Sequence, residues 1–207
     1  MVAVLEAPDQ AGLELILHQR RANGQDRWDE CWDGRYIVLQ PPSIEHFDVV
    51  KFLSRVFERG VERDGGRFDA GCAVSDRVER WIENFRQPDV SVFLSGNSAD
   101  PHRTHWAGGP DLAVEVVSPG DRTYEKLGFY AAVGTRELLI IDRDPWALAT
   151  YQPQEGKMVE TARVGVGDGP IALASLPATL ELNAATRHPA TVSLSIAYEG
   201  RAEAAEF

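Results

Sequence analysis

The chain has 207 residues, of which 43% are hydrophobic and 26% charged, and such a composition lets a globular protein bury a core without disulfide or metal staples. Its 21 basic and 32 acidic residues give a formal net charge of −11, which argues against a generic basic coat for nucleic acid. No window approaches about 18 uninterrupted apolar residues, and the N-terminus lacks a signal-peptide pattern. We therefore expect a cytoplasmic protein without a membrane span.

The length predicts one domain with appendages rather than two full domains. We divide the chain into an N-terminal appendage over residues 1–24, a single central domain over residues 25–183, and a C-terminal strand and tail over residues 184–207. Neither repeats nor low-complexity tracts interrupt this organisation.

Cysteine and histidine spacing does not indicate a zinc site. Cys31 and Cys72 lie outside any CxxC motif, which is typical of unlinked thiols in a reducing compartment. His102 and His105 form an HxxH pair in a stretch rich in Pro and Gly, without a second pair of ligands nearby. We do not expect this pair to bind a metal.

The first elements of the central domain are a hairpin and a helix. Asp33-Gly34 stands between a Trp-rich and a β-branched flank, the pattern of a type I′ hairpin turn. Ser43 is placed to cap a helix over about residues 44–59, with Gly60 at its C-terminal end. Helical spacing predicts a buried stripe made of Ile44, Phe47, Val50, Leu53 and Phe57.

Strands dominate the rest of the domain. One is expected over about residues 67–75 and another in FRQPDVSVFL, followed by a loop over residues 96–109. PDLAVEVVSP and ELLIID are nearly continuous apolar runs, typical of strands buried on both faces. Between them, Tyr124, Leu127, Tyr130 and Ala131 form the stripe of a second helix over about residues 122–133.

The last segments read as a β-meander. ALATYQ and KMVETARV flank QPQEG as a hairpin, IALASL and TLEL follow, and TVSLSIAY alternates near the end. This order predicts an α/β fold of mixed α+β type. We expect a mixed central sheet flanked by helices, with an N-terminal hairpin and a C-terminal meander.

Glu115 stands in the middle of LAVEVV, where burying an unpaired carboxylate is costly. Alternation puts Asp111 on the same strand face, but about 13 Å away at roughly 3.3 Å per residue, too far to share one metal ion. Asp89 begins the preceding strand, and antiparallel pairing would bring it beside Glu115 and send Asp111 towards Leu94. We therefore expect Asp89 to be the partner of Glu115.

A lysine would complete a hydrolytic site by stabilising charge on an attacked phosphate. The position two residues after Glu115 is Val117, so the strand does not supply one. Lys126 is the nearest lysine, and its helix leaves from the end of the Glu115 strand. Two interpretations stay open: a lysine folded back towards Glu115, or a solvated helix residue that follows Glu125.

Several of these strings together resemble the Uma2 family, also called DUF820, of restriction endonuclease-like proteins. The matching strings are RQPDVSVF, PDLAVEVVSPGD and EKLGFYAAVGTRELLIID, with PPSIEH at the start of the first helix. The resemblance covers residues 28–182. The order helix, three strands, helix, strand, with Asp on the second strand and Glu on the third, also looks like the core of PD-(D/E)xK nucleases.

The resemblance implies a restriction-endonuclease-like core and a divalent-metal site. It implies that Asp89 and Glu115 hold Mg²⁺ or Mn²⁺ and that Lys126 replaces the usual lysine of the motif. It further implies that Glu45 matches an additional acidic position of the first helix, with His46 beside it in the cleft. The expected catalytic set is therefore Asp89, Glu115, Lys126 and Glu45.

The leading prediction is a metal-dependent endonuclease that hydrolyses DNA phosphodiester bonds. We also expect a homodimer, since two-fold symmetry would suit cleavage of a duplex. Arginines near the expected site would supply a phosphate-binding rim: Arg77, Arg80, Arg86, Arg103 and Arg122. Two alternatives stay open: a nuclease-fold module that binds or assembles without cleaving, and a hydrolase of a small phosphorylated substrate. GxSxG and P-loop motifs are both missing, which disfavours a serine hydrolase and a P-loop NTPase.

Overall fold

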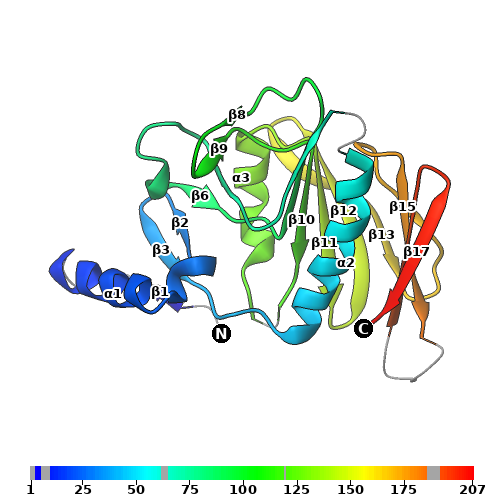
Figure 1. The fold of residues 1–207 in the computed structure, drawn as a ribbon, viewed down its shortest axis with the longest axis horizontal. Helices are drawn as coiled ribbons and strands as arrows, with labels where there is room; N and C mark the ends of the chain where they lie inside the picture. Colours follow the sequence, from blue (N-terminus) through cyan, green and yellow to red (C-terminus); the bar gives the residue numbers. More distant parts are fainter. Residues whose placement is uncertain (1–2, 6–9, 62–64, 119, 186–191) are drawn as a thin grey trace.

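The computed structural model describes residues 3–5, 10–61, 65–118, 120–185 and 192–207 (Figure 1). A six-stranded sheet in the order β13-β12-β11-β10-β7-β4 forms its centre. Its strands are β4 (Arg67–Asp69), β7 (Val90–Phe93), β10 (Leu112–Val116), β11 (Glu137–Arg143), β12 (Trp146–Gln154) and β13 (Lys157–Gly165). Since β10 pairs parallel to β11 and antiparallel to β7, the sheet is mixed, as the sequence predicts.

Two further sheets flank this centre. A seven-stranded sheet in the order β1-β3-β2-β6-β5-β9-β8 consists of β1 (Ala3–Leu5), β2 (Glu30–Trp32), β3 (Arg35–Val38), β5 (Ala73–Ser75), β6 (Phe85–Arg86), β8 (Asp100–Pro101) and β9 (His105–Ala107). A four-stranded sheet in the order β14-β15-β16-β17 consists of β14 (Ile171–Ala172), β15 (Ala178–Ala184), β16 (Val192–Tyr198) and β17 (Arg201–Glu206).

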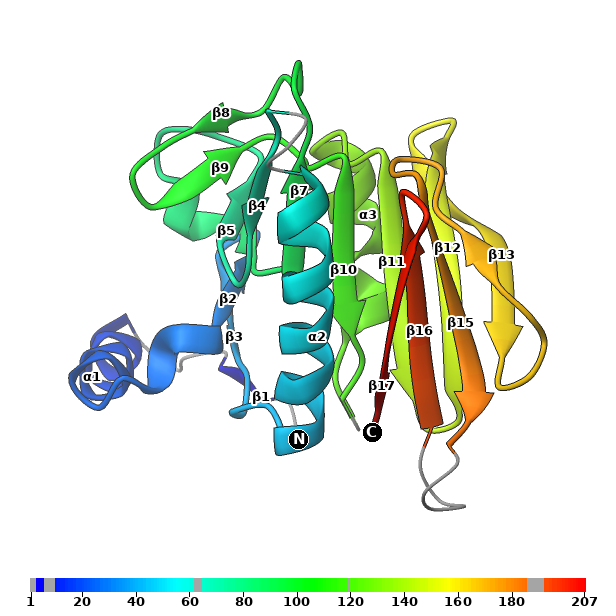
Figure 2. The ribbon, with the colours of Figure 1, turned by 45° about the vertical axis from the view of Figure 1, so that its right-hand side comes forward.

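The described helices are α1 (Gln10–Ala22), α2 (Ile44–Val61) and α3 (Leu127–Ala132), with 3₁₀ turns η1 (Gln25–Trp28), η3 (Trp81–Glu83) and η4 (Thr123–Lys126). Helix α2 lies on one face of the central sheet together with the four-stranded sheet, and α3 lies on the other (Figures 1 and 2). None of the described helices combines the length and apolarity needed to cross a membrane.

The strand β10 separates two hydrophobic cores because its side chains alternate. Leu112, Val114 and Val116 pack in the core that contains α2, whereas Ala113 packs in the core that contains α3. The alternation expected from the sequence therefore directs Glu115 to the α3 side of the sheet.

The expected hairpin and helix start are both present. Asp33 and Gly34 have φ angles of 49° and 80°, the left-handed values that a type I′ turn requires, between β2 and β3. Ser43 caps α2, since its Oγ accepts from the backbone N–H of His46 at 3.2 Å.

The buried face of α2 differs from the predicted stripe. Ile44 is 81% exposed and Phe47 46% exposed, so these two residues of the predicted stripe do not face the core. Leu53 and Phe57 are buried as predicted. The other buried residues of the helix lie outside the predicted stripe: His46, Val49, Phe52, Val56, Gly60 and Val61. An amphipathic helix of this length offers overlapping apolar stripes, and the position of the β-sheets selects one of them.

Gly60 lies inside α2 rather than at its end, because the helix runs to Val61. Its role is close packing: a Cβ built on Gly60 would lie 2.3 Å from Cε1 of Tyr198 on β16. The prediction of Gly60 as a helix terminator was therefore wrong.

Two other segments differ from expectation. The strand expected over residues 67–75 is two strands, β4 in the central sheet and β5 in the seven-stranded sheet, with Gly71 at φ 64° between them. The second helix begins as a 3₁₀ turn, and Tyr124 of its expected stripe is 41% exposed while Phe129 is buried. Neighbouring layers, rather than the local pattern, decide which of these side chains are buried.

The two ends of the chain also contain regular structure. Within residues 1–24 the structure has β1, which pairs with β3, and α1, while residues 1–2 and 6–9 lie outside the described part. Residues 201–206, expected as part of a tail, form β17, and residues 186–191 lie outside the described part. Leu194 and Ile196 of β16 are fully buried in the α2 core.

Candidate active site

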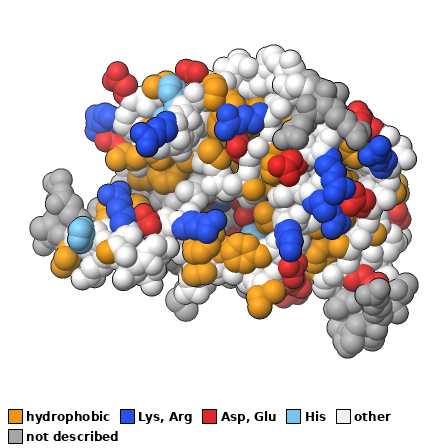
Figure 3. All heavy atoms as spheres, in the orientation of Figure 1, with side chains coloured by type: hydrophobic (Ala, Val, Ile, Leu, Met, Phe, Trp, Pro, Cys, Tyr) orange, Lys and Arg blue, Asp and Glu red, His pale blue; other side chains and the backbone are white. Residues whose placement is uncertain are grey.

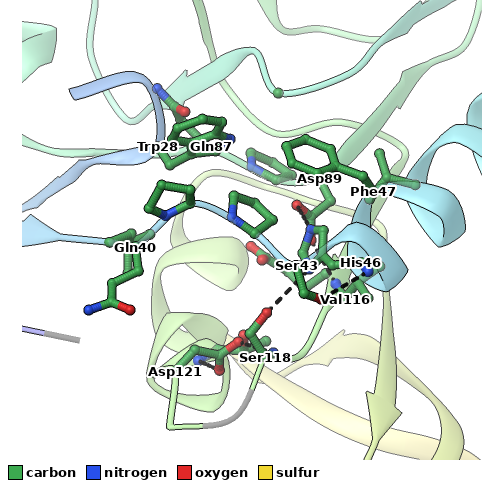
Figure 4. A pocket seen from close by; sticks show the side chains of 18 of the residues that line it. Trp28, Gln40, Ser43, His46, Phe47, Gln87, Asp89, Val116, Ser118 and Asp121 are labelled. Atoms are coloured by element: carbon green, nitrogen blue, oxygen red, sulfur yellow. Dashed lines mark hydrogen bonds and ion pairs between the residues drawn. The ribbon is translucent and has the colours of Figure 1, made fainter. Parts of the chain in front are cut away.

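A cavity of about 390 Å³ lies where the N-terminal hairpin, the start of α2 and the ends of β7 and β10 meet (Figure 4). The ionisable or hydrogen-bonding side chains in its wall include those of His46, Asp89, Glu115, Ser118, Asp121, Arg122, Lys126 and Arg143. Aromatic and proline side chains form another part of the wall: Trp28, Trp32, Pro41, Pro42, Phe47 and Pro88. A volume of this size is in the range of small-ligand sites, about 300–1,000 Å³.

Glu115 is the innermost carboxylate of the cavity, with 3% of its surface exposed. The Nζ of Lys126 lies 3.0 Å from both of its carboxylate oxygens, and the hydroxyl of Tyr130 donates to Oε1. Lys126 is therefore folded back towards Glu115, and the solvated interpretation of this lysine does not hold.

A second buried carboxylate, Glu30 of β2, completes the cluster. Its Oε1 lies 2.9 Å from Nζ of Lys126 and accepts from the backbone N–H of Gln87 at 2.9 Å, while Oε2 accepts from the indole of Trp32 at 2.7 Å. The lysine thus bridges two carboxylates that are far apart in the sequence. Every charged group of this cluster has a hydrogen-bonding partner, as buried charges require.

The charged groups of this cluster shift one another's pKa values. Burial raises the pKa of Glu115 to about 8, with Asp89 and Glu30 adding to the rise and Lys126 opposing it. Burial alone would lower the pKa of Lys126, but Glu115 and Glu30 outweigh it and raise that pKa above its usual value. Burial and the nearby carboxylates also raise the pKa of Tyr130 well above 10. Burial therefore favours the protonated form of Glu115, while the nearby carboxylates favour the protonated forms of Lys126 and Tyr130.

Two hydrogen bonds hold Asp89 at the start of β7. The register that pairs Val114 with Val90 puts Asp89 beside the end of β10, where its Oδ2 accepts from the backbone N–H of Val116 at 2.7 Å. Its Oδ1 accepts from Nε2 of His46 at 2.9 Å. With Nε2 donating, Nδ1 of a neutral ring accepts from the hydroxyl of Ser118, 3.3 Å away.

Asp111 lies at the opposite end of the same strand pair. Its Oδ2 accepts from the backbone N–H of Leu94 and from Asn97 Nδ2, both at 2.7 Å, and its Oδ1 lies 3.0 Å from Arg136. Asp111 is fully buried and is not part of the cavity wall described above. Its contact with Leu94 is the one that antiparallel pairing predicts.

Glu45 takes a different position from His46, its neighbour on α2. Its side chain is 46% exposed, and its Oε2 lies 2.7 Å from Nη1 of Arg143. The described α2 residues in the cavity wall are His46, Phe47 and Val50, so Glu45 is not among them. Arg143 is 6% exposed and also donates to Ser118 Oγ at 3.1 Å. The structure therefore brings Asp89, Glu115 and Lys126 together and leaves Glu45 at the rim.

Comparison with known proteins assigns the chain to a family. The sequence model of the Uma2 family, described as "Putative restriction endonuclease", matches residues 14–185. The chain belongs to the Uma2 family. No curated protein matches it.

A solved structure supports the same fold. It is the crystal structure of "a putative nuclease belonging to DUF820" from Anabaena variabilis ATCC 29413, which is similar with a TM-score of 0.57 and 19% sequence identity. The match covers 71% of this chain and 82% of that chain. At this identity the likeness shows a nuclease-type fold and carries no residue roles.

Three residues of this Uma2 site lie outside the catalytic set expected from the sequence: Glu30, Tyr130 and Arg143. Glu30 lies in a short hairpin strand, and its partner Lys126 belongs to another layer, so local sequence carries no signal for their contact. Tyr130 was predicted only as part of an apolar stripe. Since buried tyrosines usually find a hydrogen-bond partner, the combination of a buried tyrosine and a buried carboxylate on facing elements was an available signal.

The expected arginine rim is mostly engaged elsewhere. Of the five arginines, Arg122 is the one in the wall of the cavity, where it pairs with Glu125. Arg86 is buried, with its guanidinium 4.2 Å from the ring centroid of Phe129 and 4.7 Å from that of Trp32. It helps to join the hairpin to α3.

The donor set is compatible with a magnesium or manganese ion. Mg²⁺ prefers oxygen ligands and is commonly held by one or two carboxylates with several waters. Asp89 and Glu115 supply two carboxylates from adjacent strands to one cavity. Within the described residues there is no group of three or more His, Cys, Asp or Glu side chains placed to hold a metal, so such an ion would keep most of its waters.

Proposed function

We propose that this Uma2 protein is a Mg²⁺- or Mn²⁺-dependent endonuclease that hydrolyses phosphodiester bonds of DNA. The observation that carries the proposal is the pair Asp89 and Glu115, which reaches one cavity from neighbouring strands beside a buried lysine. These two carboxylates would hold the ion. When bound, the ion supplies a water of lowered pKa and neutralises charge on the phosphate.

The remaining residues of the site prepare it for a phosphate group. Lys126 keeps a positive charge next to Glu115, where it would stabilise the negative charge that develops in the transition state. Glu30 and Tyr130 hold that arrangement, and His46 orients Asp89. Glu45 fixes Arg143 at the rim and, in this proposal, does not bind the metal.

One observation keeps a second function in consideration. The cavity has the volume of a small-ligand site, and the chain is acidic overall, which suits a hydrolase of a small phosphorylated substrate.

The proposed compartment is the cytoplasm, where Cys31 and Cys72 would stay reduced, and the proposed assembly is a homodimer.

A cleavage assay with matched variants tests the proposal. Plasmid DNA and a single-stranded oligonucleotide are incubated with the wild type in Mg²⁺, Mn²⁺ or EDTA, and the products are separated on gels. Glu115→Gln and Asp89→Asn should each reduce the cleavage rate at least about 100-fold, because each removes a metal ligand. Glu203→Gln, which removes a surface carboxylate paired with Arg55 and Arg59, is the control.

Two results of this assay would contradict the proposal. If wild-type protein shows no cleavage in either metal, or if Glu115→Gln cleaves as fast as the control, the endonuclease function is wrong. Release of inorganic phosphate from nucleotides, blocked by the same two variants, would instead favour the small-substrate hydrolase.

A further inference from the structure

The cavity has one aromatic edge that the metal chemistry does not use. Trp28 ends η1 and Phe47 lies in the first turn of α2, and their ring centroids are 6.2 Å apart with 66° between the ring planes. In Figure 4 both lie along one side of the pocket, with Ser118 and Asp121 on the other and Asp89 close to Phe47. We call Trp28 and Phe47 the aromatic edge.

These two rings are not needed to fill the protein interior. Phe47 is 46% exposed and Trp28 is partly exposed, and neither belongs to the hydrophobic core clusters of the described residues. Large aromatic side chains held at a surface beside an active site are typical of binding surfaces.

Two amide side chains belong to the same cavity wall as the aromatic edge. Gln40 and Gln87 are also part of the cavity wall, and Figure 4 shows Gln87 next to Trp28. An amide carries both a donor and an acceptor, which is the combination that recognises the edge of a nucleobase. Rings for stacking and amides for base edges therefore line the same cavity.

Few of the cations in the cavity wall are free to neutralise the several phosphates that a duplex presents. Lys126 pairs with Glu115 and Glu30. Arg122 pairs with Glu125, and Arg143 pairs with Glu45. Arg27 has no ion pair with a described residue, and its guanidinium lies 5.6 Å from the ring centroid of Trp28.

The surrounding surface leads to the same conclusion. On the face drawn in Figure 3, Lys and Arg side chains are interspersed with acidic and hydrophobic ones, and the described residues form no continuous basic surface there. Proteins that bind duplex DNA obtain most of their non-specific affinity by neutralising several phosphates. Binding to this site must therefore draw on contacts other than phosphate neutralisation.

We propose that the site takes an unpaired nucleotide of a DNA single strand, with its base stacked on the aromatic edge and its phosphate next to Asp89 and Glu115. This inference rests on the endonuclease function proposed above and names the substrate class of that site. The faces of a base are available for stacking on protein only when the base is out of the duplex stack. Stacking on an aromatic side chain strengthens binding by about 5- to 160-fold per base and tolerates any sequence.

Equilibrium binding measures this preference directly. We would record the fluorescence anisotropy of a labelled single-stranded oligonucleotide, and of the same sequence as a duplex, with wild-type protein. The buffer contains Ca²⁺ as the probe ion in place of Mg²⁺ and Mn²⁺. The single strand should bind at least about tenfold more tightly. Trp28→Ala and Phe47→Ala should each weaken single-strand binding by about 5- to 160-fold, and Trp28→Phe should retain most of it.

The control variant is Ile44→Ala. Ile44 is 81% exposed on the same helical turn as Phe47 and is not part of the cavity wall, so its truncation should leave binding unchanged. Thermal melts of all variants confirm that each is folded. The inference is overturned if the duplex binds as tightly as the single strand, if the aromatic variants bind like the control, or if a mononucleotide binds as tightly as the strand.

Failure of this inference and failure of the endonuclease function give different results. Metal-dependent cleavage that requires Glu115, with binding that ignores the aromatic edge, would refute the single-strand substrate and leave the nuclease. Single-strand binding that requires the aromatic edge, without cleavage in Mg²⁺ or Mn²⁺, would refute the nuclease and leave the nucleotide site.

Discussion

Glu115 lies inside the protein because donors surround it on the α3 side of the sheet. Lys126 contacts both of its oxygens and Tyr130 donates to one of them, so the carboxylate is hydrogen-bonded although water is excluded. Removing one member of such a cluster usually destabilises a protein, because the groups that remain are buried without partners. In the intact cluster, the carboxyl group of Glu115 has a raised pKa, so its protonation depends on pH.

The raised pKa of Glu115 predicts how stability changes with pH. Since folding raises this pKa from its usual value to about 8, the folded state binds the proton more tightly than the unfolded state does. The resulting stabilisation is complete below the unfolded pKa of about 4.3 and is lost as the pH rises through 8. Without added metal, the melting temperature of the wild type should therefore fall between mildly acidic and alkaline pH.

Glu115→Gln removes this titration, so its melting temperature should depend less on pH over the same interval. Scanning calorimetry across the pH series measures both proteins, with Glu203→Gln as the control for a lost surface carboxylate. Equal pH dependence in wild type and Glu115→Gln would show that another group is responsible.

His46 is expected to act through Asp89. Its Nε2 donates to Asp89 while Ser118 contacts Nδ1, so the ring is fixed at both nitrogens. Groups that orient a metal ligand typically change metal affinity by about 10- to 100-fold when they are removed. His46→Ala should weaken Mn²⁺ binding by this factor, measured by titration calorimetry, and His46→Gln should recover part of it. Glu45→Gln, one residue away, should leave the affinity unchanged, and equal losses in both would contradict the assignment.

At the scale of elements, α2 connects the candidate active site to the C-terminal sheet. Its first turn supplies His46 and Phe47 to the cavity, while its last turns pack on β16, where Phe57 and Tyr198 have ring centroids 6.3 Å apart. The four-stranded sheet therefore helps to set where α2, and with it the wall of the cavity, lies on the central sheet.

Gly60→Ala tests this contact between α2 and β16. In an exposed helix, alanine is more favourable than glycine by about 1 kcal/mol. Here the added Cβ would lie 2.3 Å from Cε1 of Tyr198, so we expect a net destabilisation of about 1–3 kcal/mol in urea unfolding. In the double variant Gly60→Ala/Tyr198→Ala the two effects should be less than additive, because the clash is gone. A Gly60→Ala protein as stable as wild type would show that the contact is loose.

At the scale of the molecule, the cavity lies where separate layers meet. The hairpin supplies Trp32, the central sheet supplies Asp89 and Glu115, η4 supplies Lys126, and α2 supplies His46. A ligand bound there would contact groups from several layers at once. Because these groups come together only in the folded chain, such a ligand stabilises the folded state as a whole.

Millimolar Mg²⁺ or Mn²⁺ should therefore raise the melting temperature of the wild type. At a free concentration of about 100 times Kd the stabilisation is about 2.7 kcal/mol, which corresponds to roughly 5–10 °C for a domain of this size. Differential scanning fluorimetry should show this increase, and Asp89→Asn and Glu115→Gln should lose most of it. A wild type that melts at the same temperature with and without either ion would contradict the metal site.

Local patterns were sufficient for much of the architecture. The apolar runs of β10 and β11, the Asp33-Gly34 turn and the Ser43 cap each depend on a few neighbouring residues, and the structure contains all of them. Strand arithmetic also placed Asp89 beside Glu115 and sent Asp111 to the far end of the strand pair, since side-chain alternation and strand spacing are nearly constant.

Only the tertiary structure decided which side chains face the cavity. The sequence left two positions of Lys126 open, and it did not show that Glu45 lies at the rim or which stripe of α2 is buried. Each of these depends on which layer packs against the segment. Glu30 shows the same limit most clearly. Its ion pair with Lys126 forms between elements from different layers, and the favourable electrostatic contact exists only after folding has brought them together and excluded water.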